Sequence, residues 1–197
     1  EDLITEEDVV VTLSNTGYVK AHEITSYHAQ HRGGRGKVAT SVKAQDFVKN
    51  MVVASTHDTI LCFSTLGKVY WLKVYQIPRA QRTARGQPIV NLLPLSDGER
   101  ISAILPMHSF SQAGFVFMVT TQGLVKKVSI SEFARSRSTG KIALQLIDGD
   151  ELQSAALTSG DNDIILVSDA GKAILFHEDQ VRAMGRTAKG VRGMQLK

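Results

Sequence analysis

The stretch that decides the fold is a basic loop with three glycines, Gln30-His31-Arg32-Gly33-Gly34-Arg35-Gly36. Weaker versions of this loop return three more times, each at nearly the same distance after a strand-turn-strand pattern. Glycine lets backbone N–H groups approach a phosphate closely, and arginine clamps phosphate oxygens with two parallel donors. Four such loops on one repeating scaffold predict a curved row of phosphate contacts, and therefore a surface that binds and bends a nucleic acid.

Working outward from this loop, the sequence contains four copies of Ser/Thr-x-x-Gly. Their glycines are separated by 50, 56 and 48 residues, and they are Gly17, Gly67, Gly123 and Gly171. An apolar run rich in β-forming residues precedes each copy, which is typical of a tight hairpin with a glycine in the left-handed conformation. A second glycine follows at offsets of 19, 19, 17 and 19 residues, at Gly36, Gly86, Gly140 and Gly190. Such regular spacing indicates an internal repeat.

Each repeat predicts four strands in roughly 50 residues, which is typical of a propeller blade. The expected first strands are 9–13, 60–63, 115–119 and 164–167, and the return strands carry Val19, Val69, Val125 and Ala173. Third strands are expected at 38–42, 89–93 and 142–146, and fourth strands at 51–54, 101–105 and 152–157. The sequence therefore predicts an all-β, propeller-like array in one domain, residues 1–197, with approximate blades 9–56, 59–105, 115–157 and 164–197. A β-sandwich is the alternative.

Charge follows the repeat. The segments 17–43, 67–90, 123–141 and 171–192 each contain five Lys or Arg, together 20 of the 23 basic residues but only 4 of the 19 acidic ones. These segments therefore carry +16, while the remainder carries −12 and the whole chain only +4. Stacked repeats would place these segments on one rim. A basic rim can follow the phosphates of duplex DNA, and a solvated charged face is the alternative interpretation.

The predicted phosphate-binding residues are the basic and glycine-rich positions of these segments. In the first repeat they are Lys20, Gln30, His31, Arg32, Gly33, Gly34, Arg35, Gly36 and Lys37; in the second, Lys68, Arg82 and Arg85; in the third, Lys126, Lys127, Arg135, Arg137 and Lys141; and in the fourth, Lys172, Arg186, Lys189 and Arg192. The sequence shows no recognition helix or zinc finger and only 6% aromatic residues. Binding should therefore be largely independent of base sequence.

No catalytic, metal or nucleotide motif stands out. The sequence lacks a Walker-type loop and a His-Glu-x-x-His pattern, and its six histidines show no metal-ligand spacing. Cys62 is the single cysteine, so an internal disulfide is excluded; it lies in an apolar run and is expected to pack in the core. No apolar run approaches the roughly 20 residues of a membrane span. We expect no cofactor in this chain, no membrane partner and a cytoplasmic location.

The heptapeptide resembles the signature box of the DNA gyrase A C-terminal domain, Gln-Arg/Lys-Arg-Gly-Gly-Arg/Lys-Gly. His31 is the one departure in seven positions. Similar stretches run along the sequence, among them Glu1-Asp2-Leu3-Ile4-Thr5, Thr56-His57-Asp58, 88–94 and Gly190-Val191-Arg192-Gly193. The sequence opens without Met, so we interpret it as a piece of a longer protein, with four of the family's usual six blades and without its acidic tail.

This resemblance implies a β-pinwheel, whose blades exchange strands and whose rim wraps DNA with positive handedness. It implies double-stranded DNA as a partner, together with the rest of gyrase A and the ATPase gyrase B in an A2B2 enzyme at the bacterial nucleoid. It also implies that the catalytic tyrosine, ATP and Mg²⁺ belong to other parts of that topoisomerase, which introduces negative supercoils. The alternatives are a topoisomerase IV-type C-terminal domain, in which the first box is degraded, and a propeller scaffold that binds proteins.

Overall fold

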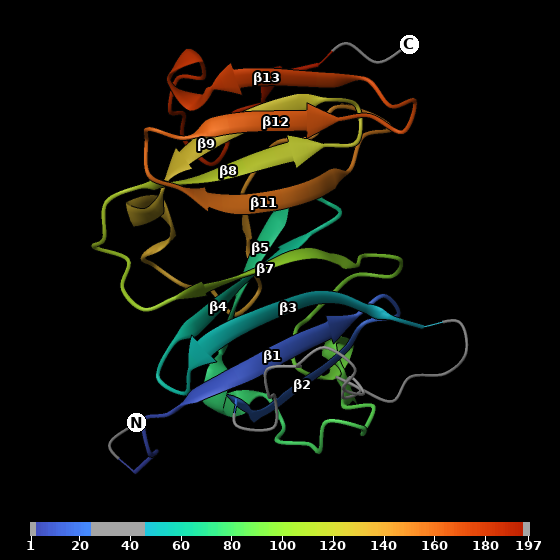
Figure 1. Ribbon diagram of the computed structural model, residues 1–197, viewed down its shortest axis with the longest axis vertical. Coiled ribbons are helices and arrows are strands. Elements are labelled where there is room, and N and C mark those ends of the chain that lie inside the picture. The colour runs from blue at the N-terminus through green and yellow to red at the C-terminus, as the bar shows by residue number, and fades with distance from the viewer. Residues whose placement is uncertain (1–2, 25–45, 195–197) are drawn as a thin grey trace, which may run out of the picture. The chain divides into compact units, whose positions relative to one another are not determined.

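The structure is a computed structural model that describes residues 3–24 and 46–194 (Figure 1). Within these ranges the chain forms β-strands joined by turns and by short 3-10 helices, and no α-helix is found in them. The prediction of an all-β fold is confirmed. The 3-10 helices are η2 (Val74–Gln76), η3 (Ile89–Asn91), η4 (Ile130–Phe133) and η5 (Glu178–Gln180).

The described strands form four sheets. The first has the order β3-β1-β2-β6, with β1 (Asp8–Ser14), β2 (Tyr18–Glu23), β3 (Val48–Ser55) and β6 (Gln87–Pro88). The second has the order β10-β5-β4-β7, with β4 (Thr59–Ser64), β5 (Lys68–Lys73), β7 (Ile101–Met107) and β10 (Lys141–Ile142). The third has the order β11-β8-β9-β14, with β8 (Phe115–Thr120), β9 (Leu124–Ser129), β11 (Leu152–Thr158) and β14 (Val191–Arg192). The fourth pairs β12 (Asp163–Val167) with β13 (Ala173–His177).

The Ser/Thr-x-x-Gly motif closes the hairpin of every repeat by the same hydrogen bonds. In the first repeat the Gly17 N–H donates to the Ser14 carbonyl (3.0 Å) and the Tyr18 N–H donates to Ser14 Oγ (3.0 Å). Equivalent bonds are made at Ser64, Thr120 and Ser168. The four turn glycines have φ between +76° and +91°, a conformation that side chains disfavour. The predicted left-handed hairpin turn is confirmed.

The third strands of repeats two to four do not complete their own sheets. Strand β6, from the second repeat, pairs with β2 of the first. Strand β10 pairs likewise with β5 of the preceding repeat, and β14 pairs with β9. Each of these sheets is thus closed by a neighbour in sequence, the strand exchange that characterises a β-pinwheel.

The bounds predicted for the third strands were wrong. The expected strand 89–93 is mostly helix η3, in which the Leu92 N–H donates to the Ile89 carbonyl (2.9 Å). Of the expected strand 142–146 only Ile142 lies in a strand, the two-residue β10 (Lys141–Ile142). The pairing lasts only two residues because the chain then turns, whereas apolar composition extends further. The expected strand 38–42 lies outside the described residues.

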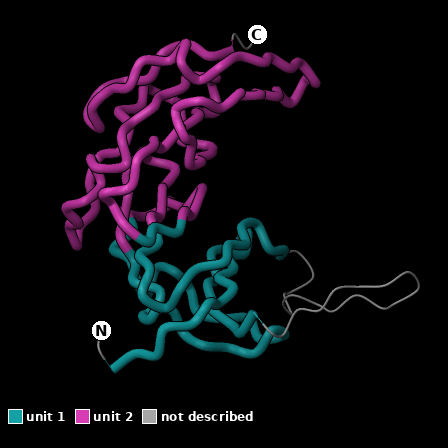
Figure 2. Tube along the Cα trace, turned by 60° about the vertical axis from the view of Figure 1, so that its left-hand side comes forward, with its two compact units in different colours: residues 1–60, 72–95, 106–108 teal, residues 61–71, 96–105, 109–197 magenta. Residues whose placement is uncertain are grey.

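Contacts between Cα atoms divide the chain into two compact units (Figure 2). Unit 1 contains the described parts of 1–60, 72–95 and 106–108, and unit 2 those of 61–71, 96–105 and 109–197. Unit 1 holds the first sheet, whose inner residues, such as Val9, Val11 and Val19, are at most 1% exposed. The predicted single domain and its blade limits stay predictions.

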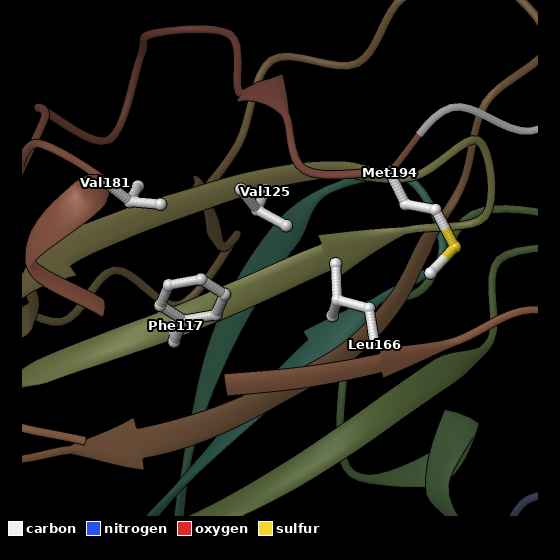
Figure 3. Close-up of a cluster of buried hydrophobic side chains, with 5 residues drawn as sticks. All are labelled: Phe117, Val125, Leu166, Val181 and Met194. Carbon is white, nitrogen blue, oxygen red and sulfur yellow. The ribbon is translucent and has the colours of Figure 1, made fainter. Parts of the chain in front are cut away.

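Unit 2 holds the third and fourth sheets and a core cluster of five apolar side chains. Phe117, Val125, Leu166, Val181 and Met194 come from β8, β9, β12 and the segments after η5 and β14, and they point toward one another (Figure 3). Elsewhere in this unit Cys62 of β4 is fully buried, and burial raises the pKa of its thiol to about 12. Its predicted role in core packing is confirmed.

A matched pair of turn glycines tests the exchanged strand. An added Cβ at Gly123 would lie 2.4 Å from the Met194 carbonyl oxygen, whereas at Gly171 it would meet nothing within 4 Å. Both glycines have positive φ, so Gly171→Ala should lower the free energy of unfolding by about 1 kcal/mol from backbone strain alone. Gly123→Ala should lower it by at least about twice as much, because the backbone following β14 must also move. Urea unfolding measures both values, and equal losses would contradict the close approach.

Candidate nucleic-acid interface

The richest predicted site cannot be placed. Gln30, His31, Arg32, Gly33, Gly34, Arg35, Gly36 and Lys37 lie outside the described residues. The interface is therefore built from the loops of repeats two to four, named the second loop (79–86), the third loop (135–140) and the fourth loop (182–190).

The second loop is fastened to the first repeat at both ends. At its start Ala21 donates to the Pro78 carbonyl (3.1 Å) and accepts from the Ala80 N–H (3.0 Å). At its end β6 pairs with strand β2. Between these points the Ala84 N–H donates to the Gln81 carbonyl (2.9 Å), which closes a turn with residues 82 and 83 at its centre.

The charged side chain of Arg85 in this loop is also held in place. The Arg85 guanidinium lies 3.7 Å from the centre of the Tyr18 ring. This cation–π contact holds the side chain against the strand to which its own loop is fastened.

The fourth loop repeats this construction in unit 2. It begins where the Met184 N–H donates to the Lys127 carbonyl (2.8 Å), and it ends where β14 pairs with β9. The Ala188 N–H donates to the Gly185 carbonyl (3.2 Å), so residues 186 and 187 occupy the centre of the turn. The two loops also share a sequence, Arg-Thr-Ala-Arg-Gly at 82–86 and Arg-Thr-Ala-Lys-Gly at 186–190.

The third loop is built differently. Its glycine, Gly140, lies 17 residues after the hairpin glycine of its repeat, whereas this spacing is 19 residues in the other repeats. The Tyr70 ring fills the space beside Gly140, where a Cβ would lie 2.6 Å from Tyr70 Cε1. The Tyr70 hydroxyl donates to the buried Glu99 carboxylate (2.9 Å).

Lysine side chains close the third loop from either end. Lys68 Nζ donates to the Thr139 carbonyl (3.1 Å), and Lys141 Nζ donates to the Arg135 carbonyl. The side chains of Arg135 and Arg137 are left exposed.

Three predicted rim cations are not on the surface. Lys20, Lys126 and Lys127 are 1%, 0% and 6% exposed. Lys127 lies 3.6 Å from the buried Glu178 carboxylate and donates to the Glu178 carbonyl (3.1 Å). The prediction that these lysines face DNA beside the loop arginines is therefore corrected. The reason is geometric, because segments of the next repeat cover these return strands: the basic loops cover Lys20 and Lys126, and Glu178 covers Lys127, which points to the other face of its strand from Lys126.

The ammonium groups of Lys20 and Lys126 bind loop carbonyls. Lys20 Nζ donates to the carbonyls of Gln81 (3.3 Å), Ala84 (2.7 Å) and Arg82. Lys126 Nζ donates to the carbonyls of Ala143 (3.0 Å), Arg186 (2.6 Å) and Ala188 (2.8 Å). Each ammonium thus ties a loop to the return strand of the preceding repeat.

Burial lowers the pKa of both lysines to about 8, and nearby guanidinium groups contribute to the shift. The second cause is Arg82 for Lys20 and Arg186 for Lys126. Desolvation disfavours the charged amine, while the accepting carbonyls favour it. Both side chains are therefore mostly charged at pH 7.

The remaining predicted cations of the described residues lie at or near the surface. The exposed ones are Arg135, Arg137, Lys172, Lys189 and Arg192, and the partly exposed ones are Lys68, Arg82, Arg85, Lys141 and Arg186. Desolvation, followed by the charges of Arg186, Arg137 and Arg135, lowers the pKa of Lys141. These mutual effects place Lys141 and three arginines of the third and fourth loops in one electrostatic neighbourhood.

One of these arginines, Arg186, lies beside both a carbonyl and an acidic group. Arg186 Nη1 donates to the Ile142 carbonyl (3.1 Å), and its Nε lies 4.0 Å from the Glu132 carboxylate. Outside the predicted set, Arg79 pairs with Glu7. Such an arrangement supplies hydrogen-bond donors and positive charge, which is the chemistry of phosphate binding.

Residues 3–24 and 46–194 contain no cluster of three or more His, Cys, Asp or Glu suited to a metal ion. Nor do they include a helix of the length and apolarity that crossing a membrane requires.

Sequence reasoning missed Thr83 and Thr187, which stand at equivalent turn positions, and the exposed Arg182. The repeated Arg-Thr-Ala signal was present in the sequence. The correspondence of Lys20 and Lys126, each three residues after its hairpin glycine, was visible too, but their burial was not.

The buried amine of Lys126 should make stability rise with pH. Between pH 8 and 10.5 the unfolded chain holds a proton that the folded protein has released, so the free energy of unfolding increases over this window. Urea unfolding at pH 7.5 and pH 9.5 should therefore show the wild type gaining stability relative to Lys126→Met. Lys172→Met, which removes an exposed lysine, is the control. If the free energies of unfolding of the wild type and of Lys126→Met change by the same amount between the two pH values, the lowered pKa of Lys126 is contradicted.

Comparisons with known proteins agree with this architecture. The profile of the family described as DNA gyrase C-terminal domain, beta-propeller, matches four times, at residues 8–55, 58–106, 114–159 and 162–197. DNA gyrase A from Salmonella typhimurium is 59% identical over 196 residues, and that from Escherichia coli is 56% identical. Each alignment covers all of this chain but only 22% of the relative's length.

Two solved structures share the fold. The C-terminal domain of DNA topoisomerase IV has a TM-score of 0.80 and 31% identity, covering 99% of this chain and 59% of that one. A DNA gyrase A C-terminal domain has a TM-score of 0.75 and 28% identity, covering 97% and 61%. The four profile matches, together with alignments to gyrase A over the whole of this sequence, show that it belongs to the DNA gyrase A C-terminal domain family.

Proposed function

We propose that this chain binds double-stranded DNA along its Arg- and Lys-bearing loops and wraps it with positive handedness. It does so as a non-catalytic part of DNA gyrase, a type II topoisomerase. Wrapping would present a DNA segment to the catalytic parts of the enzyme, which use ATP and Mg²⁺ to introduce negative supercoils. The proposed partners are the remainder of gyrase A and the ATPase gyrase B in an A2B2 assembly at the nucleoid of the cytoplasm.

The observation that carries this proposal is the shared construction of the second and fourth loops. Each presents the same Arg-Thr-Ala-Arg/Lys-Gly sequence, and each is fastened at both ends and in the middle to the preceding repeat. A cation presented on a fixed backbone loses little conformational entropy when it meets a phosphate. Phosphate contacts of this kind fix position on the duplex without reading bases.

Two other functions remain as alternatives. A topoisomerase IV-type domain shares the fold, but the relatives at 55–59% identity over 192 or more residues are gyrase A proteins. The near-intact box at 30–36 also favours gyrase. A protein-binding scaffold would not need positive charge at corresponding positions of successive repeats.

A linking-number assay tests the wrapping directly. Relaxed plasmid is incubated with the chain, treated with topoisomerase I, freed of protein and separated on a gel. Positive-handed wrapping should leave the plasmid positively supercoiled, and to a degree that grows with protein concentration. Binding without a change in linking number would favour the topoisomerase IV-type alternative, and a lack of binding at low salt would favour the scaffold.

The salt dependence of binding reports how many phosphates are contacted. If six or more are neutralised, the slope of log affinity against log salt concentration should be about −5 or steeper. The double variant Arg82→Ala/Arg85→Ala should make this slope shallower by about 2, because two contacts are lost. Fluorescence anisotropy with a labelled duplex measures both slopes. A wild-type slope near −1 would refute the loop interface.

A further inference from the structure

Two buried lysines impose the same backbone orientation on two separate loops. Lys20 donates to the carbonyls of residues 82 and 84, and Lys126 donates to those of residues 186 and 188. In each loop, one of the two carbonyls lies four residues and the other two residues before the second glycine, which is Gly86 in the second loop and Gly190 in the fourth. The two ammonium groups therefore act on corresponding peptide units.

Peptide geometry then decides where the next N–H groups point. The described residues contain no cis peptide bond, and in a planar trans peptide the N–H points opposite to the preceding C=O. The N–H groups of Thr83 and Arg85 consequently point away from the Lys20 ammonium. Those of Thr187 and Lys189 point away from the Lys126 ammonium in the same manner.

The outer side of each turn is accessible. Thr83, Thr187 and Lys189 are exposed, and Arg85 is partly exposed. Outward N–H groups of a turn form an anion-binding concavity, and the charge of the lysine behind them adds to the attraction. Such a site contains backbone donors, a threonine hydroxyl and a flanking guanidinium or ammonium group.

We propose that each of these turns seats one DNA phosphate on its backbone N–H groups, those of Thr83 and Arg85 in the second loop and those of Thr187 and Lys189 in the fourth. The buried lysines at 20 and 126 are the positioning residues that turn these N–H groups outward, and they do not touch DNA. This inference rests on the proposed function, and it identifies the donors that hold the phosphate.

The third loop provides an internal contrast. Its counterpart of Lys20 and Lys126 is Tyr70, whose recorded hydrogen bonds join its hydroxyl to the Glu99 carboxylate rather than to a loop carbonyl. The two exposed arginines of this loop therefore stand without a lysine at the equivalent position behind them. The third loop should thus lack the pair of N–H groups that a single buried lysine turns outward in the second and fourth loops.

The experiment is an amide NMR titration of the 197-residue chain with a short duplex DNA, and separately with inorganic phosphate. In the wild type, the amide protons of residues 83, 85, 187 and 189 should move downfield with both probes. Lys20→Met should abolish the shifts at 83 and 85 but keep those of the fourth loop. Lys126→Met should keep the shifts at 83 and 85, abolish the one at 187 and weaken the one at 189, because the Gln145 N–H still holds the Ala188 carbonyl (3.2 Å). Each variant should bind DNA about 5-fold more weakly, with a salt slope shallower by about 1.

Tyr70→Phe is the matched control, because it removes a buried hydrogen bond at the equivalent position without touching these turns. It should leave the four amide shifts unchanged. If either methionine variant fails to fold, the wild-type titration still decides. If the wild type binds DNA while the four amide signals stay unperturbed, this inference alone is overturned. The same holds if a folded Lys20→Met variant binds DNA with the wild-type affinity and the wild-type salt slope. A wild type that does not bind DNA at low salt would overturn the proposed function itself.

Discussion

The structure depends on the hydrogen bonds between each return strand and a short segment of the following repeat. Strands β2, β5 and β9 would otherwise be sheet edges with unpaired backbone groups. The two-residue strands β6, β10 and β14 cover them. Close backbone approach leaves no room for a side chain at Gly86 or Gly190, where a Cβ would lie 2.5 Å and 2.7 Å from the carbonyl oxygens of Val19 and Val125. The exchange thus explains the second glycine of these repeats.

The same exchange places a charge in the interior. A buried ammonium is costly unless it is hydrogen-bonded, and Lys20 and Lys126 each have three carbonyl acceptors. Most of those acceptors belong to the second and fourth loops, and in the fourth loop the Ala188 carbonyl also accepts from the Gln145 N–H of the preceding repeat (3.2 Å). The buried lysine and the loop therefore depend on each other. The loop carbonyls accept hydrogen bonds from the ammonium group, and the ammonium group holds the loop in one conformation.

This linkage gives the basic loops a physical character that charge alone does not provide. A mobile arginine loses conformational entropy when it binds phosphate, whereas Arg85, stacked on Tyr18 beside a tethered turn, has lost part of it already on folding. The third loop, built on Tyr70 and Glu99, holds its exposed arginines with less support. The repeats thus share an architecture but differ in how firmly they present charge.

By itself, the sequence determined the all-β class, the hairpins and the family. The first two depend on local rules, because Ser/Thr-x-x-Gly closes a turn through its own backbone and hydroxyl, and β-branched runs mark the strands on either side. The sequence also placed most cations on loops, and among the described residues ten of the predicted cations are exposed or partly exposed. Only the tertiary structure decided which sheet each third strand joins, and which lysines face inward. Pairing across repeats joins residues such as Val19 and Gln87, 68 positions apart, for which the sequence carries no local signal. Lys20 and Lys172 both follow a hairpin glycine, at offsets of three and one residues. Lys20 is buried under a loop of the next repeat, whereas Lys172 is exposed.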